Sequence, residues 1–292
     1  MRGWARALAL GLVAGVVVAS LALLRTIRRA LVSHPLGGAV APYGYVEYVP
    51  ALPGPRPLVI VLHGAGSAGD GSDPSTLVDR LPPLRELALT RTFGFASKLA
   101  DAGAVVVAPQ SPGRWDTEQL DAFVDYVLRT HSVDPARVYL TGVSMGGGGA
   151  FRYAAAHPER LAAVMPICGA AVGSAELVKR LDTLPVRAFH AWDDSVVPNY
   201  WSATWVAAIA ARRGADAKNP MLSYPVGTDA TATLEGKGLV WRPGTSAEPE
   251  QALTLTEYAR GDHRIWARVW GDPASWRWLF AQRRVPPAAS PR

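Results

Sequence analysis

Hydrophobic residues along this chain fall into short runs separated by longer amphipathic segments. Runs rich in β-branched residues predict buried parallel strands, and they occupy 58–62, 104–108, 138–140, 161–168 and 186–190. Two other segments, 43–48 and 252–258, alternate apolar and polar residues, which also predicts strands. Helical patterns cover 117–131, 150–156, a segment beginning at Pro198, and 273–284. This order predicts an α/β domain with a mostly parallel central sheet and helices on both faces.

A longer apolar run stands near the amino terminus. Ala7 to Leu24 contains 18 apolar or small residues between flanking arginines, enough to be a candidate membrane-spanning helix. Val18-Ala19-Ser20 could form a cleavage site, but it lies inside the run, which is longer than the apolar core of about 7–15 residues in a signal peptide. We therefore expect residues 1–33 to hold an uncleaved anchor, with a cleaved signal as the alternative. Arginines flank both sides, but the start resembles an export signal, so we expect the domain that follows to lie outside the cytoplasm.

The remaining chain fits one sizeable domain. A length of 292 residues leaves 34–284 for the α/β unit and 285–292 for a proline-rich tail. Glycines and prolines interrupt 214–250, which predicts an insertion between the last helix and strand. A passive surface excursion and a substrate-facing lid are both open readings of this insertion.

Charge and cysteine content exclude several classes of protein. The net charge is +6, but five arginines lie in the first 29 residues, and the remainder carries 25 basic and 24 acidic groups. The high isoelectric point is therefore no argument for nucleic-acid binding. Cys168 is the only cysteine, which excludes an internal disulfide and a cysteine-based metal site. Its apolar neighbours predict a buried, inert thiol.

The strand at 138–140 leads into Gly142-x-Ser144-x-Gly146, and a helical segment follows. Strand, tight turn and helix form the context in which this pattern is a nucleophile elbow. Such a turn holds the serine in a strained backbone conformation and exposes its hydroxyl. It also directs the Met145 N–H and the start of the helix toward the negative charge that develops on a substrate.

A second glycine-rich loop follows the strand at 58–62. In His63-Gly64-Ala65-Gly66, we expect the Ala65 N–H to form the other half of an oxyanion hole and Gly66 to lie near the substrate. His63 could act as a base, but a histidine at this strand end is expected to shape the loop.

Two acidic residues and one histidine complete the candidate chemistry. Asp193 and Asp194 follow the strand at 186–190; Asp194 lies four residues before Pro198 and is the predicted triad acid, whereas Asp193 would cap or solvate the loop. His263 follows the last predicted strand and is the predicted base. The order Ser144, Asp194, His263 is the one that this fold requires, and loops after parallel strands share one edge of the sheet.

Three tryptophans flank segments expected near that edge. Trp115, Trp192 and Trp266 could stack on an aromatic or sugar substrate, or they could simply pack between loops and core.

These residues together resemble the serine esterases of the α/β-hydrolase superfamily, near the feruloyl-esterase and polyhydroxybutyrate-depolymerase-like enzymes and related predicted peptidases. The matching segments are 62–66, 108–110, 138–147, 166–169, 194–198 and His263-x-x-Trp266. The resemblance implies the α/β-hydrolase fold, with Ser144 as nucleophile, Asp194 as acid and His263 as base. The chain departs from the family pattern at Ser67, Ala68, Ala191 and Arg264 and in its longer 214–250 segment, which leaves the substrate open.

The sequence thus predicts a hydrolase that cleaves carboxylic esters, small or polymer-derived, through an acyl-enzyme and without a metal or organic cofactor. Two alternatives stay open. A serine peptidase would use the same triad, and a non-catalytic, membrane-tethered protein would use the same fold only to bind.

Overall fold

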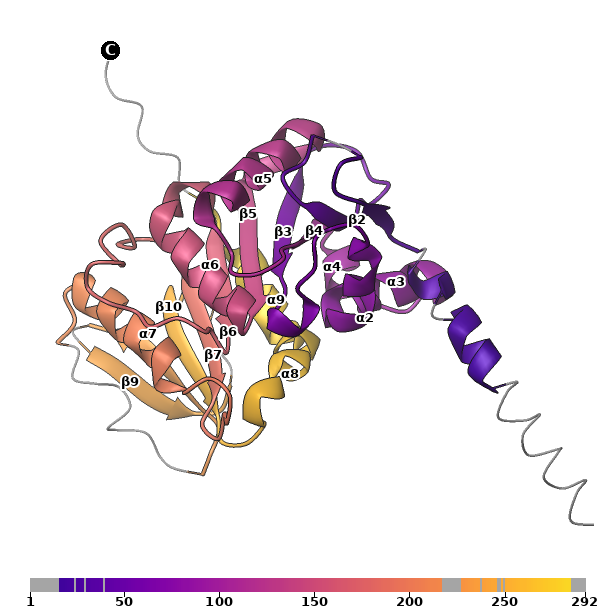
Figure 1. Ribbon diagram of the computed structural model, residues 1–292. Coiled ribbons are helices and arrows are strands. Elements are labelled where there is room, and N and C mark those ends of the chain that lie inside the picture. Colours follow the sequence, from indigo (N-terminus) through magenta and orange to yellow (C-terminus); the bar gives the residue numbers. More distant parts are fainter. Residues whose placement is uncertain are drawn as a thin grey trace, which may run out of the picture.

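The computed structural model describes residues 16–284 apart from 24, 29, 39, 217–226, 237, 246, 247 and 249. Over these residues, ten strands form one sheet in the order β1-β2-β4-β3-β5-β6-β7-β10-β8-β9 (Figure 1). The strands are β1 (Val32–His34), β2 (Gly44–Tyr48), β3 (Arg56–Leu62), β4 (Val105–Gln110), β5 (Val133–Val143), β6 (Ala163–Ile167), β7 (Val186–Ala191), β8 (Ala230–Glu235), β9 (Gly238–Pro243) and β10 (Leu253–Tyr258).

The predicted parallel sheet is confirmed. Strands β4, β3, β5, β6, β7 and β10 run parallel to one another and form its centre. Antiparallel strands extend it at both ends, β1 and β2 beside β4, and β8 and β9 beside β10. The carboxyl ends of β5, β7 and β10 therefore open on the same edge of the sheet.

Helices cover both faces, as predicted. On one face α5 (Thr117–Thr130), α6 (Met145–Ala156) and α7 (Tyr200–Arg212) share one hydrophobic core with Leu58, Ile60 and Leu62 of β3. On the other face α2 (Leu77–Arg80), α3 (Pro82–Phe93), α4 (Lys98–Asp101), α8 (Trp266–Gly271) and α9 (Pro273–Ala281) share a second core with Val59 and Val61. Successive residues of one strand thus serve two cores, because side chains alternate along a strand.

The segment 214–250, for which the sequence predicts no regular element, contributes two strands. β8 pairs with β10 from Ala230↔Glu257 to Thr233↔Thr254, and β9 pairs with β8. The threonines and alanines of β8 alternate, but the neighbouring glycines and prolines obscure this short signal. Its described part extends the sheet at one end (Figure 1); residues 217–226 of the predicted insertion lie outside the described residues.

Residues 16–23 and 25–28 are helical; 16–23 project from the body of the domain (Figure 1), whereas Ile27 is buried in the core beside α2 and α3. The Arg28 Nε–H donates to Asp79 at 2.6 Å and so fixes the end of this segment to α2. Within the described part of the chain, no helix combines the length and the apolar character needed to cross a membrane. Residues 7–15 and 24 of the predicted anchor, and the predicted tail 285–292, lie outside the described residues.

Candidate active site

Three side chains from distant parts of the chain meet at the carboxyl edge of the sheet. Ser144 follows β5, Asp194 follows β7, and His263 lies in a short 3-10 turn (Asp262–Arg264) after β10. The Ser144 Oγ lies 2.8 Å from His263 Nε2, and the His263 Nδ1 lies 2.8 Å from an Asp194 carboxylate oxygen. In this arrangement the hydroxyl donates to Nε2 and Nδ1–H donates to the carboxylate. The structure therefore brings together the three residues that the sequence analysis singled out.

The backbone at Ser144 is strained as an elbow requires. Its φ of 54° and ψ of −117° lie in a region that residues with a side chain rarely adopt. The turn is compact because the residues two positions before and after Ser144 are glycine. A Cβ on Gly142 would come within 2.5 Å of the Gly146 carbonyl oxygen, and one on Gly146 within 2.3 Å of the Leu62 carbonyl oxygen. The two glycines thus let α6 start directly against the end of β3.

Two backbone N–H groups near Ser144, those of Met145 and Ala65, are free of helical hydrogen bonds. Met145 is the first residue of α6, and Ala65 is the first residue of the 3-10 turn Ala65–Ser67, so neither N–H has a helical partner one turn earlier. A Cβ on Gly64 would lie 3.3 Å from the Ser144 Cβ, which shows how closely this loop approaches the serine. Ala65 and Gly66 are exposed, and the space beside Gly66 is open. These positions suit two oxyanion-hole donors and an adjoining substrate surface.

Asp194 is held by four N–H donors. Its side chain is fully buried. Oδ1 accepts the backbone N–H groups of Val196 at 2.9 Å and Val197 at 2.8 Å. Oδ2 accepts from His263 and, at 3.1 Å, from His190 Nε2. Burial alone would raise the pKa of Asp194, but the bonds from the two histidines and the two amides outweigh it and hold that pKa far below its usual range. The carboxylate therefore stays ionised.

His190 is the member of this cluster that sequence reasoning missed. It lies within the strand predicted at 186–190 and was read only as part of that strand. The available signal was a polar residue near the end of a buried strand, directly before the loop that carries Asp194, residues 192–198, which we call the acid loop. Because buried polar side chains are hydrogen-bonded, a histidine at this position indicates a partner in the neighbouring loop or helix.

Asp193 does not simply cap its own loop, as the sequence analysis expected. Its Oδ1 accepts the backbone N–H of Asp262 at 2.8 Å. In return, Asp262 Oδ1 accepts the N–H of Ser195 at 2.8 Å and its hydroxyl at 2.7 Å. We call Asp193, Ser195 and Asp262 the interloop clasp, because they join the loop carrying Asp194 to the turn carrying His263. The bonds from Ser195 lower the pKa of Asp262, so its carboxylate remains an acceptor.

His63 has the loop-shaping role that the sequence analysis favoured. Its Nε2 accepts the Ser111 N–H at 2.9 Å, and its Nδ1–H donates to the Gly64 carbonyl at 2.8 Å. Burial lowers the pKa of this imidazole, which remains neutral. Both nitrogens are thus committed to backbone groups of the two loops.

The three tryptophans differ in their surroundings. Trp115 is buried; its Nε1–H donates to the His63 carbonyl at 3.2 Å, and its ring packs against Gly149, so it has the packing role, one of the two alternatives for this residue. Trp192 is half-buried in the acid loop, and its backbone N–H donates to Tyr258. Trp266 is half-buried and meets the His263 ring edge-on, with ring centroids 5.7 Å apart. Trp266 therefore supports the imidazole.

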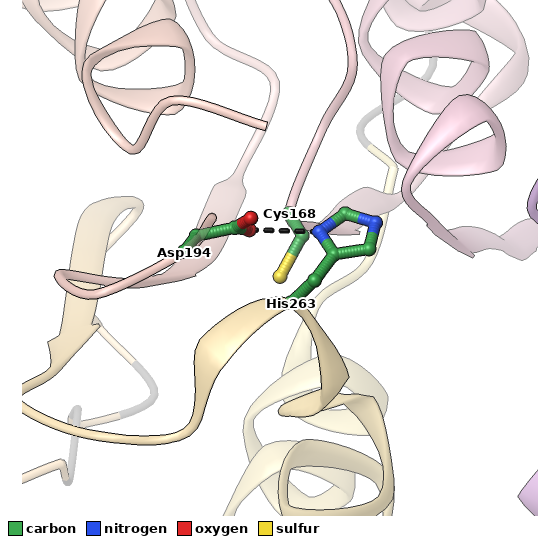
Figure 2. A group of neighbouring side chains, drawn as sticks. All are labelled: Cys168, Asp194 and His263. Atoms are coloured by element: carbon green, nitrogen blue, oxygen red, sulfur yellow. Dashed lines mark hydrogen bonds and ion pairs between the residues drawn. The ribbon is translucent and has the colours of Figure 1, made fainter. Parts of the chain in front are cut away.

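Among the described residues, one group of side chains has ligand atoms close enough for a metal ion. These are Cys168, Asp194 and His263, whose ligand atoms lie within 4.8 Å of one another (Figure 2). Burial and the nearby Asp194 carboxylate raise the pKa of the Cys168 thiol, which donates its S–H to Asp194. An ion here would have to displace the Asp194–His263 hydrogen bond and bind a protonated thiol. The donor set fits the acid–base arrangement better than a cation site.

Comparison with known proteins agrees with this architecture. Residues 57–199 match the family model of the alpha/beta hydrolase fold, which includes Ser144 and Asp194. NocK of Nocardia uniformis subsp. tsuyamanensis, provisionally named an esterase, is 30% identical over 149 residues, which cover 51% of this chain and 43% of NocK. The crystal structure of a thermostable esterase is 25% identical with a TM-score of 0.58, covering 88% of this chain and 64% of that one.

The acetyl xylan esterase from Aspergillus awamori shares the fold at 17% identity, with a TM-score of 0.54 over 85% of this chain and 99% of its own. This chain spans less than half the length of NocK and about two thirds of the thermostable esterase. The matched family model and the two solved structures show that the fold is that of the α/β hydrolases.

Proposed function

The chain has the α/β-hydrolase fold, and from this premise we propose that it is a serine esterase acting through Ser144, His263 and Asp194. One observation carries the proposal. The His263 imidazole bridges the Ser144 hydroxyl and the Asp194 carboxylate, with 2.8 Å at each end. An imidazole held in this way can remove a proton from the alcohol while the carboxylate stabilises the imidazolium that results.

In the proposed acylation step, His263 Nε2 takes the Ser144 proton as Oγ attacks the ester carbonyl carbon. The carbonyl oxygen becomes an oxyanion, which the N–H groups of Met145 and Ala65 stabilise. The tetrahedral intermediate then expels the alcohol, which leaves with the proton from Nε2. An acyl group remains on Ser144.

In the proposed deacylation step, His263 Nε2 takes a proton from a water molecule while the water oxygen attacks the acyl carbon. Collapse of the second intermediate returns that proton to Ser144 Oγ and releases the carboxylic acid. Each step needs only this chain, the ester and water, so the reaction balances without a further co-reactant.

The names of the relatives support an ester as substrate. NocK and the thermostable esterase both carry esterase names and share 30% and 25% identity with this chain. Neither favours a peptidase or a binding protein without activity. The exposed loop at Ala65 and Gly66 follows Gly64, which lies against Ser144, and it leaves room for a small ester to approach Ser144 Oγ.

Labelling with a fluorophosphonate, followed by an ester and peptide panel, tests the proposal. We expect the wild-type chain to be labelled at Ser144 and to hydrolyse short p-nitrophenyl esters, whereas Ser144→Ala loses both properties. Ser72→Ala is the matched control, because Ser72 is an exposed serine whose backbone N–H bonds Asp70, away from the triad. Undiminished hydrolysis by Ser144→Ala would refute the proposal, and turnover of peptides alone would make the chain a peptidase.

We further propose that the apolar run 7–24 anchors the protein to a membrane with its catalytic domain outside the cytoplasm. Residues 16–23 support this placement, because they are helical, largely apolar and exposed, and they project from the domain (Figure 1). Exposed apolar side chains such as Val16, Val18 and Leu21 are unusual on a surface that meets only water.

A further inference from the structure

Asp194 is shared by two histidines, only one of which contacts the serine. We infer that His190 is a positioning residue of the esterase proposed above, which fixes the Asp194 carboxylate and limits how strongly it attracts the proton of His263. The inference rests on the proposed function, since it concerns the acid of the same triad. The described hydrogen bonds of the His190 ring are to Ser202, Asp194 and Val197 and not to Ser144, so His190 would act on catalysis through Asp194.

The contacts of His190 fix its tautomer. Nε2 faces two acceptors, Asp194 Oδ2 at 3.1 Å and the Val197 carbonyl at 3.0 Å, so Nε2 carries hydrogen. Nδ1 lies 2.7 Å from the hydroxyl of Ser202 on α7, which can donate to it. The imidazole is fully buried and is held from strand, loop and helix at once. Such a side chain cannot rotate without breaking several hydrogen bonds.

This arrangement divides the lone pairs of Asp194 between two tasks. Oδ1 accepts two amides of its own loop, whereas Oδ2 accepts both imidazoles. A hydrogen bond to a carboxylate stabilises its charge and weakens its attraction for another proton. Loss of the His190 bond would therefore leave an Asp194 that holds protonated His263 more strongly. His263 serves as base only when neutral, so the acid limb of activity would move to higher pH.

Four other ionisable residues lie near His190 and Asp194, and each has a role apart from their hydrogen bond. Cys168 follows β6 and donates its S–H to Asp194, and Asp193 and Asp262 are engaged in the interloop clasp. Glu257 stands opposite His190 in the register of β7 and β10, where burial raises its pKa to about 7. None of these groups takes part in the hydrogen bond between His190 Nε2 and Asp194 Oδ2, so a substitution of His190 tests that bond directly.

The experiment compares His190→Leu with His190→Gln. Leucine removes the donor, whereas the glutamine amide can place an N–H near the position of Nε2. We expect His190→Leu to lower kcat about tenfold with little change in KM, and to move the acid limb of kcat/KM about 0.5 pH units or more upward. We expect His190→Gln to retain most of kcat and a pH profile close to that of the wild type.

His131→Leu is the matched control. His131 also bonds a carboxylate, that of Glu47 at 2.8 Å, but outside the site. Its removal should lower Tm and leave the pH profile unchanged. Ser202→Ala, which only frees Nδ1 of His190, should move the acid limb in the same direction by a smaller amount, and it replaces His190→Leu if that variant does not fold.

All rates are normalised to the fraction of enzyme that a fluorophosphonate labels. An unmoved acid limb in both His190→Leu and Ser202→Ala would overturn the inference, as would a His190→Gln variant as impaired as His190→Leu. A wild-type chain that neither labels nor hydrolyses esters is a different result, because it removes the proposed function itself.

Discussion

The Asp193 carboxylate accepts the backbone N–H of Asp262 at 2.8 Å, and so the residue beside the candidate acid holds the residue beside the candidate base. Asp262 returns the contact through Ser195, with 2.8 Å to its N–H and 2.7 Å to its hydroxyl. Asp262 adopts a positive φ of 48°, and its side chain reaches Ser195 in the loop that carries Asp194. The interloop clasp therefore sets the separation of two loops whose strands, β7 and β10, are already neighbours.

Substitutions at the two adjacent aspartates should have very different effects. Asp194→Asn removes the charge that orients His263, and we expect kcat to fall by about 10³–10⁴-fold. Asp193→Asn retains an oxygen that can accept the Asp262 N–H, so we expect a loss of roughly threefold or less. Steady-state kinetics on a p-nitrophenyl ester measures both. If Asp193→Asn were the more damaging change, the acid would have to be reassigned.

The clasp itself is tested by Asp193→Ala. Without an acceptor for the Asp262 N–H, the turn carrying His263 loses one of its ties to the acid loop. We expect kcat to fall by about tenfold while KM stays near its wild-type value, because a small misplacement of a base affects the chemical step. Asp182→Ala, which removes an exposed acidic residue bonded to Arg212 away from the site, is the control. Equal kinetics in the two variants would show that the clasp has no influence on catalysis.

The glycine that follows Ser144 by two residues should resist even the smallest side chain. In Gly146→Ala the new Cβ would come within 2.3 Å of the Leu62 carbonyl oxygen, a backbone atom. We expect a loss of about 1–3 kcal/mol in the free energy of unfolding, together with a loss of activity, because the start of α6 must move away from β3. Gly113→Ala is the control, since no atom lies within 4 Å of its added Cβ. Urea denaturation compares the two; equal stabilities would contradict the tight packing of the elbow.

Glu257 should make stability fall as pH rises. Burial raises its pKa from 4.5 to about 7, so the folded chain keeps the proton that the unfolded chain releases. The stabilising contribution of the neutral form is present in full below pH 4.5 and is lost as pH rises through about 7. Glu257→Gln does not titrate, so the stability of the variant relative to the wild type should increase by about 3 kcal/mol across this range. Urea denaturation at pH 4.5 and pH 8 measures the change, and a difference independent of pH would contradict it.

Removal of residues 1–24 should release the protein from membranes. We expect the full chain to sediment with membranes and to require detergent for extraction, whereas the shortened chain stays in the supernatant with its esterase activity intact. The truncation leaves Arg28 and its bond to Asp79 in place. Protease added outside intact cells should reach the catalytic domain. A full chain that remains in the supernatant would argue against the anchor.

The parallel sheet could be predicted because its central strands are continuous apolar runs, such as 58–62 and 104–108, whose burial on both faces leaves a strong signal. The helices α2 and α4 contain four residues each, too few for a period of 3.6 to register. Ser144 and His263 could be located from local glycine and strand patterns. The role of His190 could not, because its partners Ser202 and Asp194 are joined to it only through packing of α7 and the acid loop.

The order of strands in the sheet places Asp194 and His263 on one side of Ser144, after β7 and β10, and the ends of β3 and β4 on the other side. Ser144 follows β5 and His263 follows β10, with β6 and β7 between them, a span of three strand spacings or about 14 Å. The turn bearing His263 must reach across the ends of β7 and β6 for its Nε2 to bond the Ser144 hydroxyl. For the proposed esterase, this leaves the opposite half, at the ends of β3 and β4, for the substrate, where Ala65 and Gly66 are exposed. Enlarging the range of acceptable esters would thus mean rebuilding the segments after those two strands, while the triad's own half is left untouched.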